Sequence, residues 1–275
     1  MAGILYLVPT PIGNPRDITL RALDVLRGAT LIAAEDTRHF ATLARDHDLP
    51  RHAVSYHEHN EEARTAELIR RLEAGEDVAL VTDAGTPLLS DPGFTLVRAA
   101  AAAGIAITSL PGASAITTAL AASGLPPLPF RFIGFPPRTS GKRRTFFAAL
   151  ADDTATLVAF EAPHRLAATL ADAQAALGDR PACLARSMTK RHERYQRGLL
   201  SELEAALREE GEVRGECTLL IGGGSGPAAA PGAEEDAQML ADAGASARTV
   251  AAYLASRHGM ARRAAYEMAQ RASKA

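Results

Sequence analysis

The chain alternates short apolar segments of strand length with longer segments that have the periodicity of amphipathic helices. In the first half, strands are expected at residues 4–8, 30–34, 77–82 and 105–110. Strands that alternate with helices form βα units, and such units build mostly parallel sheets covered by helices. This alternation predicts an α/β fold.

A second series of strands is expected at residues 131–134, 155–160, 182–185 and 218–221. A proline-rich stretch separates it from the first series, and consecutive prolines interrupt both helices and sheets. We therefore expect an N-terminal α/β domain over residues 1–124 and a C-terminal α/β domain over residues 125–222. The 275 residues, 47% of them apolar, are enough for two such cores.

Two further features complete the predicted organisation. Residues 223–233 are rich in Gly, Pro and Ala and are expected to form a flexible linker, followed by a helical segment over residues 234–275. Within the first domain, Asp91 followed by Pro92 predicts the start of the helix that ends before Gly104, and Asn60 predicts the start of another.

Composition excludes several classes of protein. No apolar stretch reaches the roughly 20 residues that span a bilayer, and residues 1–8 lack the basic start of a secretory signal. Cys183 and Cys217 are isolated thiols, as expected for a cytoplasmic protein without disulfides. The formal net charge is −2, so any binding of a polyanion must use local basic patches.

The loops after several predicted strands are rich in glycine, proline and small polar residues. Ligands of open α/β sheets bind outside the carboxyl ends of the strands, where glycine permits close approach and proline fixes the loop. Any one of these loops alone is ordinary turn chemistry. Together they predict a ligand site; the loops are residues 9–14, 83–93, 111–115 and 161–165.

Other ligand motifs are absent or weak. Between Gly134 and the Gly-Lys pair at 141–142 lie six residues where a P-loop has four, and Arg143 stands where Ser or Thr would hold magnesium. The glycine-rich residues 222–226 open a linker rather than a helix, so they do not form a dinucleotide fingerprint. His57, His59 and Glu61 match no zinc spacing, and a solvated helix entry explains them better. We predict no metal.

Seven segments together carry a family resemblance: residues 9–14, 35–38, 82–93, 111–115, 134–138, 161–165 and 186–193. In order and spacing they resemble the ribosomal RNA small-subunit methyltransferase I family, over nearly all of the chain from Leu5 to about Gly222. The run Thr-Asp-Ala-Gly-Thr-Pro-Leu-Leu-Ser-Asp-Pro-Gly is the most specific segment. The chain departs from the family pattern at Thr82 and at Ser187-Met188.

The resemblance implies a class III methyltransferase, tetrapyrrole-methylase-like, that forms a homodimer. Its two α/β domains would hold S-adenosyl-L-methionine in the cleft between them, and it would methylate the ribose 2′-oxygen of a cytidine in small-subunit (16S) ribosomal RNA. The implied cofactor residues are mostly small or apolar, which suits a ligand held largely by backbone groups. They are Pro11, Ile12, Ala84, Gly85, Thr86, Leu89, Ser114, Ala115, Glu161, Ala162 and Met188.

The chemistry needs few side chains, because the sulfonium is already an activated methyl donor. A positioned base would still help a weakly nucleophilic 2′-hydroxyl. Asp36 and Asp83 are the candidate bases, although Asp36 can instead order Thr37 and Arg38, and Asp83 can instead bond backbone amides of its turn. Lys190 can stabilise the developing alkoxide or hold a phosphate.

Basic residues near the motifs are candidates for RNA contact, although charge runs are usually solvated faces. With few aromatic residues to stack on bases, shape and phosphate contacts would dominate. A cleft would accept a nucleotide splayed out of the RNA. The candidates are Arg38, Arg138, Lys142, Arg143, Arg144, Arg165 and Arg191.

Two alternatives remain open. A methyltransferase acting on a small tetrapyrrole would have the same fold and cofactor, but it would not need the Arg-rich loop or the helical C-terminal segment. A non-catalytic RNA-binding protein of ribosome assembly would use the cleft only as a scaffold.

Overall fold

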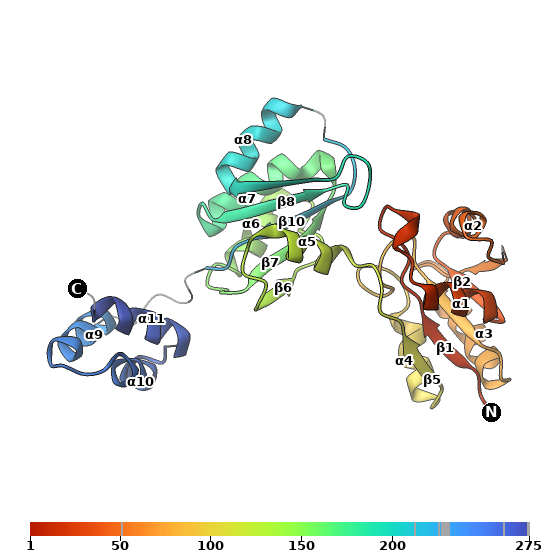
Figure 1. The fold of residues 1–275 in the computed structure, drawn as a ribbon, viewed down its shortest axis with the longest axis horizontal. Helices are drawn as coiled ribbons and strands as arrows, with labels where there is room; N and C mark the ends of the chain where they lie inside the picture. The colour runs from red at the N-terminus through yellow and green to blue at the C-terminus, as the bar shows by residue number, and fades with distance from the viewer. Residues whose placement is uncertain (51, 212, 225, 227–231, 261, 274–275) are drawn as a thin grey trace. The chain divides into compact units, whose positions relative to one another are not determined.

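The computed structural model describes residues 1–50, 52–211, 213–224, 226, 232–260 and 262–273 (Figure 1). The chain divides into two compact units, residues 1–122 with 185–194 and residues 123–184 with 195–275. The first division lies beside the predicted boundary at residue 124, whereas segment 185–194 belongs to the first unit although we expected it in the second domain. Within the predicted linker, residues 225 and 227–231 lie outside the described residues. No helix in the described ranges is long and apolar enough to cross a membrane.

A five-stranded sheet with the order β3-β2-β4-β1-β5 forms the centre of the first unit. Every paired strand in it runs parallel to its neighbour, and all four predicted strands are present. The strands are β1 (Ile4–Leu7), β2 (Leu31–Ala34), β3 (Ala53–Ser55), β4 (Val78–Val81) and β5 (Ala106–Ser109).

Helices cover both faces of this sheet, and β4 shows why. Its four residues are all buried, and alternate residues face opposite cores: Val78 and Leu80 pack in one cluster, and Ala79 and Val81 in the other. Helices α3 (Glu61–Glu73) and α4 (Phe94–Ala102) line the first core. Helices α1 (Leu20–Gly28) and α2 (Thr37–Asp46) line the second, and α5 (Ala115–Ser123) follows β5.

The start of α4 differs from the prediction. Gly93, not Asp91, is its N-cap residue. Oε1 of Glu61, at the first position of α3, accepts hydrogen bonds from the backbone nitrogens of Gly93 and Thr95, each at 3.2 Å. A carboxylate from another helix therefore satisfies the free amides at the start of α4, and Asp91 is left in the preceding loop.

The second unit also has a five-stranded sheet, with the order β6-β7-β10-β8-β9. Strand β6 (Phe130–Phe132) runs parallel to β7 (Thr156–Glu161), and β10 (Cys217–Ile221) runs antiparallel to β7. The remaining strands are β8 (Pro181–Arg186) and β9 (Arg194–Leu199). Helices α6 (Ser140–Ala148), α7 (Leu166–Leu177) and α8 (Leu200–Glu210) share one apolar core with β7, β8 and β10.

The C-terminal helices α9 (Ala233–Asp242), α10 (Ala247–His258) and α11 (Arg262–Ala272) pack around an apolar core of their own. It includes Val250, Leu254 and Met268. Nε2 of His258 lies 2.8 Å from a carboxylate oxygen of Asp236 and links α10 to α9. The α/β class and the helical end of the chain agree with the sequence pattern.

Candidate functional site

Loops at the carboxyl edge of the first sheet are bonded to one another. The backbone groups of Thr10, after β1, and Gly85, after β4, exchange two hydrogen bonds of 2.9 Å. The Thr10 hydroxyl also donates to the carbonyl oxygen of Thr82 at 3.0 Å. The Thr86 hydroxyl donates to the carbonyl oxygen of Ala113, after β5, at 3.1 Å. Three of the loops predicted to hold a ligand thus form one connected surface.

Segment 185–194 joins this surface through the loop after β1. The backbone nitrogen of Asn14 donates to the Thr189 hydroxyl at 3.0 Å. Gly13 makes the close approach possible: a Cβ there would lie 2.6 Å from Cγ of Lys190 and 2.7 Å from the carbonyl oxygen of Met188. Such distances are shorter than real side-chain contacts, so glycine is required at this position.

Four non-glycine residues of these loops have left-handed backbone conformations. They are Leu88 and Ser90, with φ of 76° and 75°, and Ser187 and Thr189, with φ of 48° and 63°. A left-handed conformation is costly for residues other than glycine, and it persists only where the surrounding structure enforces it. Such strain gathers at ligand sites more often than elsewhere in proteins.

The predicted cofactor residues of the first unit lie on these bonded loops. Leu89 and Ala84 are exposed, Gly85 and Met188 are buried, and the others are half-buried. The set comprises Pro11, Ile12, Ala84, Gly85, Thr86, Leu89, Ser114, Ala115 and Met188. Gly85 holds its loop through its two backbone bonds to Thr10, and the small side chains of Ala84, Ser114 and Ala115 let a ligand approach the main chain, so this set fits a cofactor held by backbone contacts.

Glu161 and Ala162 lie in the second unit, at the end of β7. Glu161 is 3% exposed, and its Oε2 accepts a hydrogen bond of 2.6 Å from the Thr169 hydroxyl. Its Oε1 accepts the backbone amide of Ala162 at 2.8 Å and lies 3.2 Å from Nε of Arg165. This carboxylate holds the turn after β7 in place.

Asp36, a predicted base, is the N-cap residue of α2. Its Oδ1 accepts the Arg38 backbone amide at 2.8 Å, and its Oδ2 lies 2.7 Å from Nη2 of Arg38. The Arg38 side chain, followed by its backbone amide, holds the pKa of Asp36 well below its usual range. A carboxylate with so low a pKa is a weak proton acceptor.

Asp83, the other predicted carboxylate, connects two strand ends. Its Oδ1 accepts the backbone amide of Asp36 at 3.1 Å, and its own amide donates to Oε2 of Glu35 at 3.3 Å. Burial raises the pKa of Glu35, and the nearby negative charges of Asp83 and Asp36 add to the rise. Asp83 thus bonds backbone across to β2 rather than within its own turn.

Asp91 is a titratable group that the sequence did not point to. Burial raises its pKa to about 7, and the charges of Glu35 and Asp83 act in the same direction. A carboxyl group that titrates near neutrality in a cavity is typical of functional sites. The sequence predicts Asp91 only as a helix cap, because its approach to Glu35 depends on tertiary structure.

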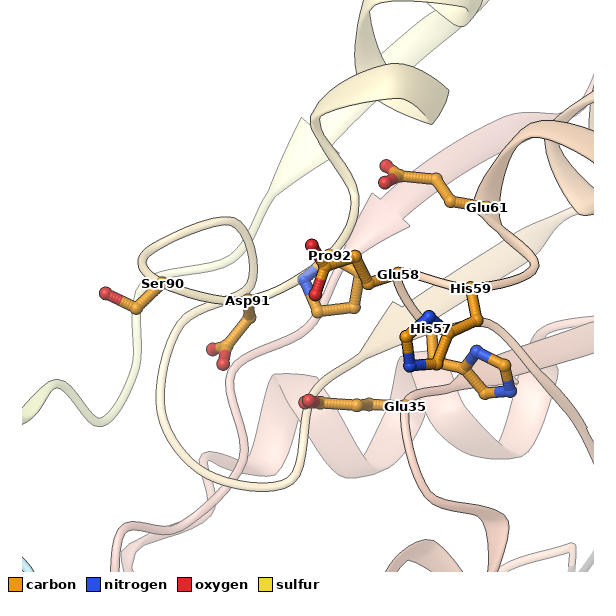
Figure 2. A pocket seen from close by; sticks show the side chains of 8 residues that line it. All are labelled: Glu35, His57, Glu58, His59, Glu61, Ser90, Asp91 and Pro92. Atoms are coloured by element: carbon orange, nitrogen blue, oxygen red, sulfur yellow. The ribbon is translucent and has the colours of Figure 1, made fainter.

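Asp91 and Glu35 line a pocket of about 500 Å³ in the first unit (Figure 2). Glu35 reaches in from the end of β2, and its carboxylate points toward the side of the pocket where Asp91 lies. The rings of His57 and His59 stand together on another side, with centroids 5.9 Å apart. The remaining lining residues are Glu58, Glu61, Ser90 and Pro92.

The backbone of His57 belongs to the turn that precedes α3. The Asn60 side chain accepts the backbone amide of His57 at 2.9 Å, so this turn holds the entry to α3. Among the described residues, no group of three or more His, Cys, Asp or Glu side chains is arranged to hold a metal ion.

The predicted RNA contacts fall into two sets. Arg38, Arg138, Lys142, Arg144 and Arg191 are exposed. Arg143, in contrast, is 3% exposed and forms an ion pair of 2.6 Å with Asp172. Arg165 is half-buried and donates to the carbonyl oxygens of Pro136 and Pro137 at 2.5 and 3.1 Å. The second set contacts protein rather than solvent. Lys190 is half-buried beside Gly13.

The sequence is similar to proteins of a known family. The family model described as Tetrapyrrole (Corrin/Porphyrin) Methylases matches residues 4–204. The chain is 54% identical to "Ribosomal RNA small subunit methyltransferase I" of Micromonospora olivasterospora over 222 residues, which cover 81% of this chain and 71% of that protein.

Solved structures show the same fold. The uroporphyrin-III-C-methyltransferase of Thermus thermophilus matches with a TM-score of 0.56 and 27% identity, over 80% of this chain and 94% of that one. A Thermus thermophilus enzyme of the same name, solved in complex with S-adenyl homocysteine, matches with a TM-score of 0.53 and 24% identity, over 80% and 97%.

Proposed function

Because this chain belongs to the tetrapyrrole (corrin/porphyrin) methylase family, and within it to the proteins named ribosomal RNA small subunit methyltransferase I, we propose that it methylates small-subunit ribosomal RNA. The methyl donor is S-adenosyl-L-methionine, and the proposed acceptor is the ribose 2′-oxygen of a cytidine. The observation that carries the proposal is the connected surface of loops after β1, β4 and β5, made of the segments that resemble this family.

We assign the cofactor to that surface. Ala84 and Thr86 would offer main-chain groups, and Gly85 would hold their loop through its bonds to Thr10. Ile12 and Leu89 would offer apolar contact, and the remaining cofactor residues named above keep their proposed roles. When bound, S-adenosyl-L-methionine supplies a methyl group on a sulfonium, which is activated without help from the protein. The protein must then align the acceptor oxygen and exclude water.

A carboxylate in the pocket beside this surface, that of Asp91, would accept the proton of the 2′-hydroxyl. Asp91 shares the loop of Gly85 and Thr86, and its pKa of about 7 is matched to transferring a proton at neutral pH. The low pKa of Asp36 makes that residue a poorer acceptor than Asp91. We therefore assign the proton to Asp91, with Asp83 holding the strand ends together and Lys190 facing the developing alkoxide.

Exposed basic side chains would contact RNA phosphates: Arg38 and Arg191 in the first unit, and Arg138, Lys142 and Arg144 in the second. These cations form local basic patches, as RNA binding requires of a protein whose net charge is −2. We further propose that the protein acts in the cytoplasm as a homodimer.

The test offers three acceptors in parallel with radiolabelled S-adenosyl-L-methionine: purified small ribosomal subunits, bare ribosomal RNA, and a porphyrin precursor. Label is expected in RNA, and digestion with mass spectrometry should place it in 2′-O-methylcytidine. Label in the porphyrin alone would instead make the chain a small-molecule methyltransferase. Label in no acceptor would favour a non-catalytic assembly protein.

A further inference from the structure

A buried carboxylate in the second unit contacts the basic residues at the start of α6. Asp172, on α7, is 3% exposed and accepts hydrogen bonds from three side chains. Its Oδ1 accepts the Ser140 hydroxyl at 2.9 Å and Nε of Arg144 at 2.7 Å. Its Oδ2 accepts Nε of Arg143 at 2.9 Å and lies 2.6 Å from Nη2 of the same residue.

These bonds keep the carboxylate ionised. Burial by itself would raise the pKa of Asp172, but the hydrogen bonds from Arg144, Ser140 and Arg143 outweigh it and lower the pKa. A buried charge with several matched donors is costly to leave unpaired, so its partners stay in one arrangement.

Arg143 connects Asp172 to the loop before α6. Its Nη1 donates to the carbonyl oxygens of Pro137 and Arg138 at 3.3 and 3.1 Å. Arg165 supports the same loop from η2 (Pro163–Arg165) by bonding Pro136 and Pro137. The backbone that bears the exposed Arg138 side chain is thus fixed from beneath by two guanidinium groups.

Arg144 differs from Arg143 in facing solvent. Its side chain is 61% exposed, and Nε is the atom that bonds Asp172. Asp172 holds Nε and so restrains the guanidinium, while most of the side chain faces solvent. Residues 138–144 contain four cations and no acid, and the one charge of Asp172 balances only one of them. This strip is therefore locally basic in a protein with a negative net charge.

We propose that Asp172 is a positioning residue that orients Arg144, and through Arg143 the Arg138 loop, to bind backbone phosphates of the RNA substrate. The inference rests on the proposed function for the identity of the polyanion. A guanidinium already fixed by a carboxylate loses less side-chain entropy when it binds a phosphate than a freely rotating one does. Asp172 would thus act on RNA affinity without touching RNA.

The test uses the full chain, methyl transfer to small ribosomal subunits that lack the modification, and a cycle of Asp172→Asn, Arg144→Ala and the double variant. Loss of one phosphate contact should raise KM for the subunits by roughly tenfold and lower the salt slope of binding by about one. We expect Asp172→Asn to raise KM nearly as much as Arg144→Ala does, with kcat and S-adenosyl-L-methionine affinity unchanged. The double variant should raise KM by less than the product of the two single effects, because Asp172 acts partly through Arg144.

Two controls separate orientation from folding and from general charge. Arg131→Ala removes another exposed arginine that pairs with a carboxylate, Asp153 at 2.9 Å, and should leave KM unchanged. Arg144→Lys keeps the charge without the planar fork, and its KM should stay raised. If Asp172→Asn unfolds, Ser140→Ala, which removes one donor from the same carboxylate, should raise KM about twofold.

The role of Asp172 would be overturned if the two single effects on KM multiplied in the double variant. It would also be overturned if Asp172→Asn lowered kcat and left KM unchanged. If the wild-type protein transferred no methyl group to subunits, the proposed function would fail instead, and direct binding of subunits by the same variants would still decide the inference.

Discussion

Oε1 of Glu61 lies 3.2 Å from the backbone nitrogen of Gly93, so a residue of α3 caps α4. The same oxygen accepts the Tyr56 hydroxyl at 3.1 Å. We expect Glu61→Ala to lower the free energy of unfolding by about 2 kcal/mol, since it leaves two amides without an acceptor and removes one of the two hydrogen bonds of the buried Tyr56 hydroxyl, which keeps its bond to Thr65. Urea unfolding measures this, with the exposed neighbour Glu62→Ala as the control. Equal losses in the two variants would contradict the cap.

Gly13 provides a test of the loop surface. Gly13→Ala would place a methyl group against Lys190 and Met188 and push segment 185–194 away. We expect S-adenosyl-L-methionine to bind at least about tenfold more weakly, measured by calorimetry, because a small displacement disrupts a preformed site. Gly28→Ala is the matched control, because its methyl group would meet nothing within 4 Å. Unchanged affinity in Gly13→Ala would argue against a cofactor site at this surface.

The raised pKa of Asp91 makes stability depend on pH. A carboxyl group whose pKa rises on folding favours the folded state while it is protonated. Its contribution is full below the unfolded pKa of about 3.9 and is lost as pH rises through about 7. Asp91→Asn should therefore be more stable than wild type at pH 8, by on the order of 1 kcal/mol after allowance for solvent screening, with a smaller difference at pH 5.

Urea unfolding at both pH values measures this difference, and Asp24→Asn is the control because its side chain is 77% exposed. A difference between Asp91→Asn and wild type that does not change with pH would show that Asp91 has an ordinary pKa.

The raised pKa of Asp91 also predicts how the rate of methyl transfer depends on pH. If Asp91 accepts the hydroxyl proton, kcat/KM for RNA should rise with pH and level off above about 7. Asp91→Asn should lower kcat by roughly 100-fold and remove that step, leaving KM for the cofactor similar. Asp36→Asn should retain the step. A wild-type profile without a step near pH 7 would show that another group, or water itself, accepts the proton.

Arg38 tests RNA contact in the first unit. Its side chain is 90% exposed, although its guanidinium is bonded to Asp36. We expect Arg38→Ala to weaken subunit binding several-fold and to lower the salt slope by about one. Arg21→Ala, an exposed arginine on α1, should leave both unchanged. A weaker affinity with an unchanged slope would mean that Arg38 acts through Asp36 rather than on a phosphate.

Strands rich in apolar residues were predictable, whereas the short strand β3 and the polar strand β9 were not. The buried strand β4 stands out as an apolar run because both faces are covered. Strand β3 has only three residues, and β9 reads Arg-Tyr-Gln-Arg-Gly-Leu, without apolar alternation. Both are edge strands, where one side of the backbone has no partner strand and burial is slight.

The candidate site was predictable to the level of its loops but not of its charges. Glycine and proline mark loops locally, so the sequence could indicate them. The pKa of Asp91 depends on Glu35 and Asp83, which approach it only in the fold. The burial of Arg143 had a local signal: Arg143 and Phe147 are one helical turn apart on the buried face of α6. The run of basic residues around it nevertheless predicts a surface position, so the sequence places Arg143 among the RNA contacts.

The left-handed residues Leu88, Ser90, Ser187 and Thr189 lie on the loops assigned to the cofactor. A glycine at Ser90 or Ser187 would relieve backbone strain on the order of 1 kcal/mol, whereas at Leu88 or Thr189 it would also remove a side chain that packs in the first core or accepts the Asn14 amide. Searches for heat-resistant variants would therefore tend to select substitutions at Ser90 and Ser187. Heat resistance gained there would come from loosening the backbone that shapes the ligand surface, so selection for thermal tolerance alone would erode turnover.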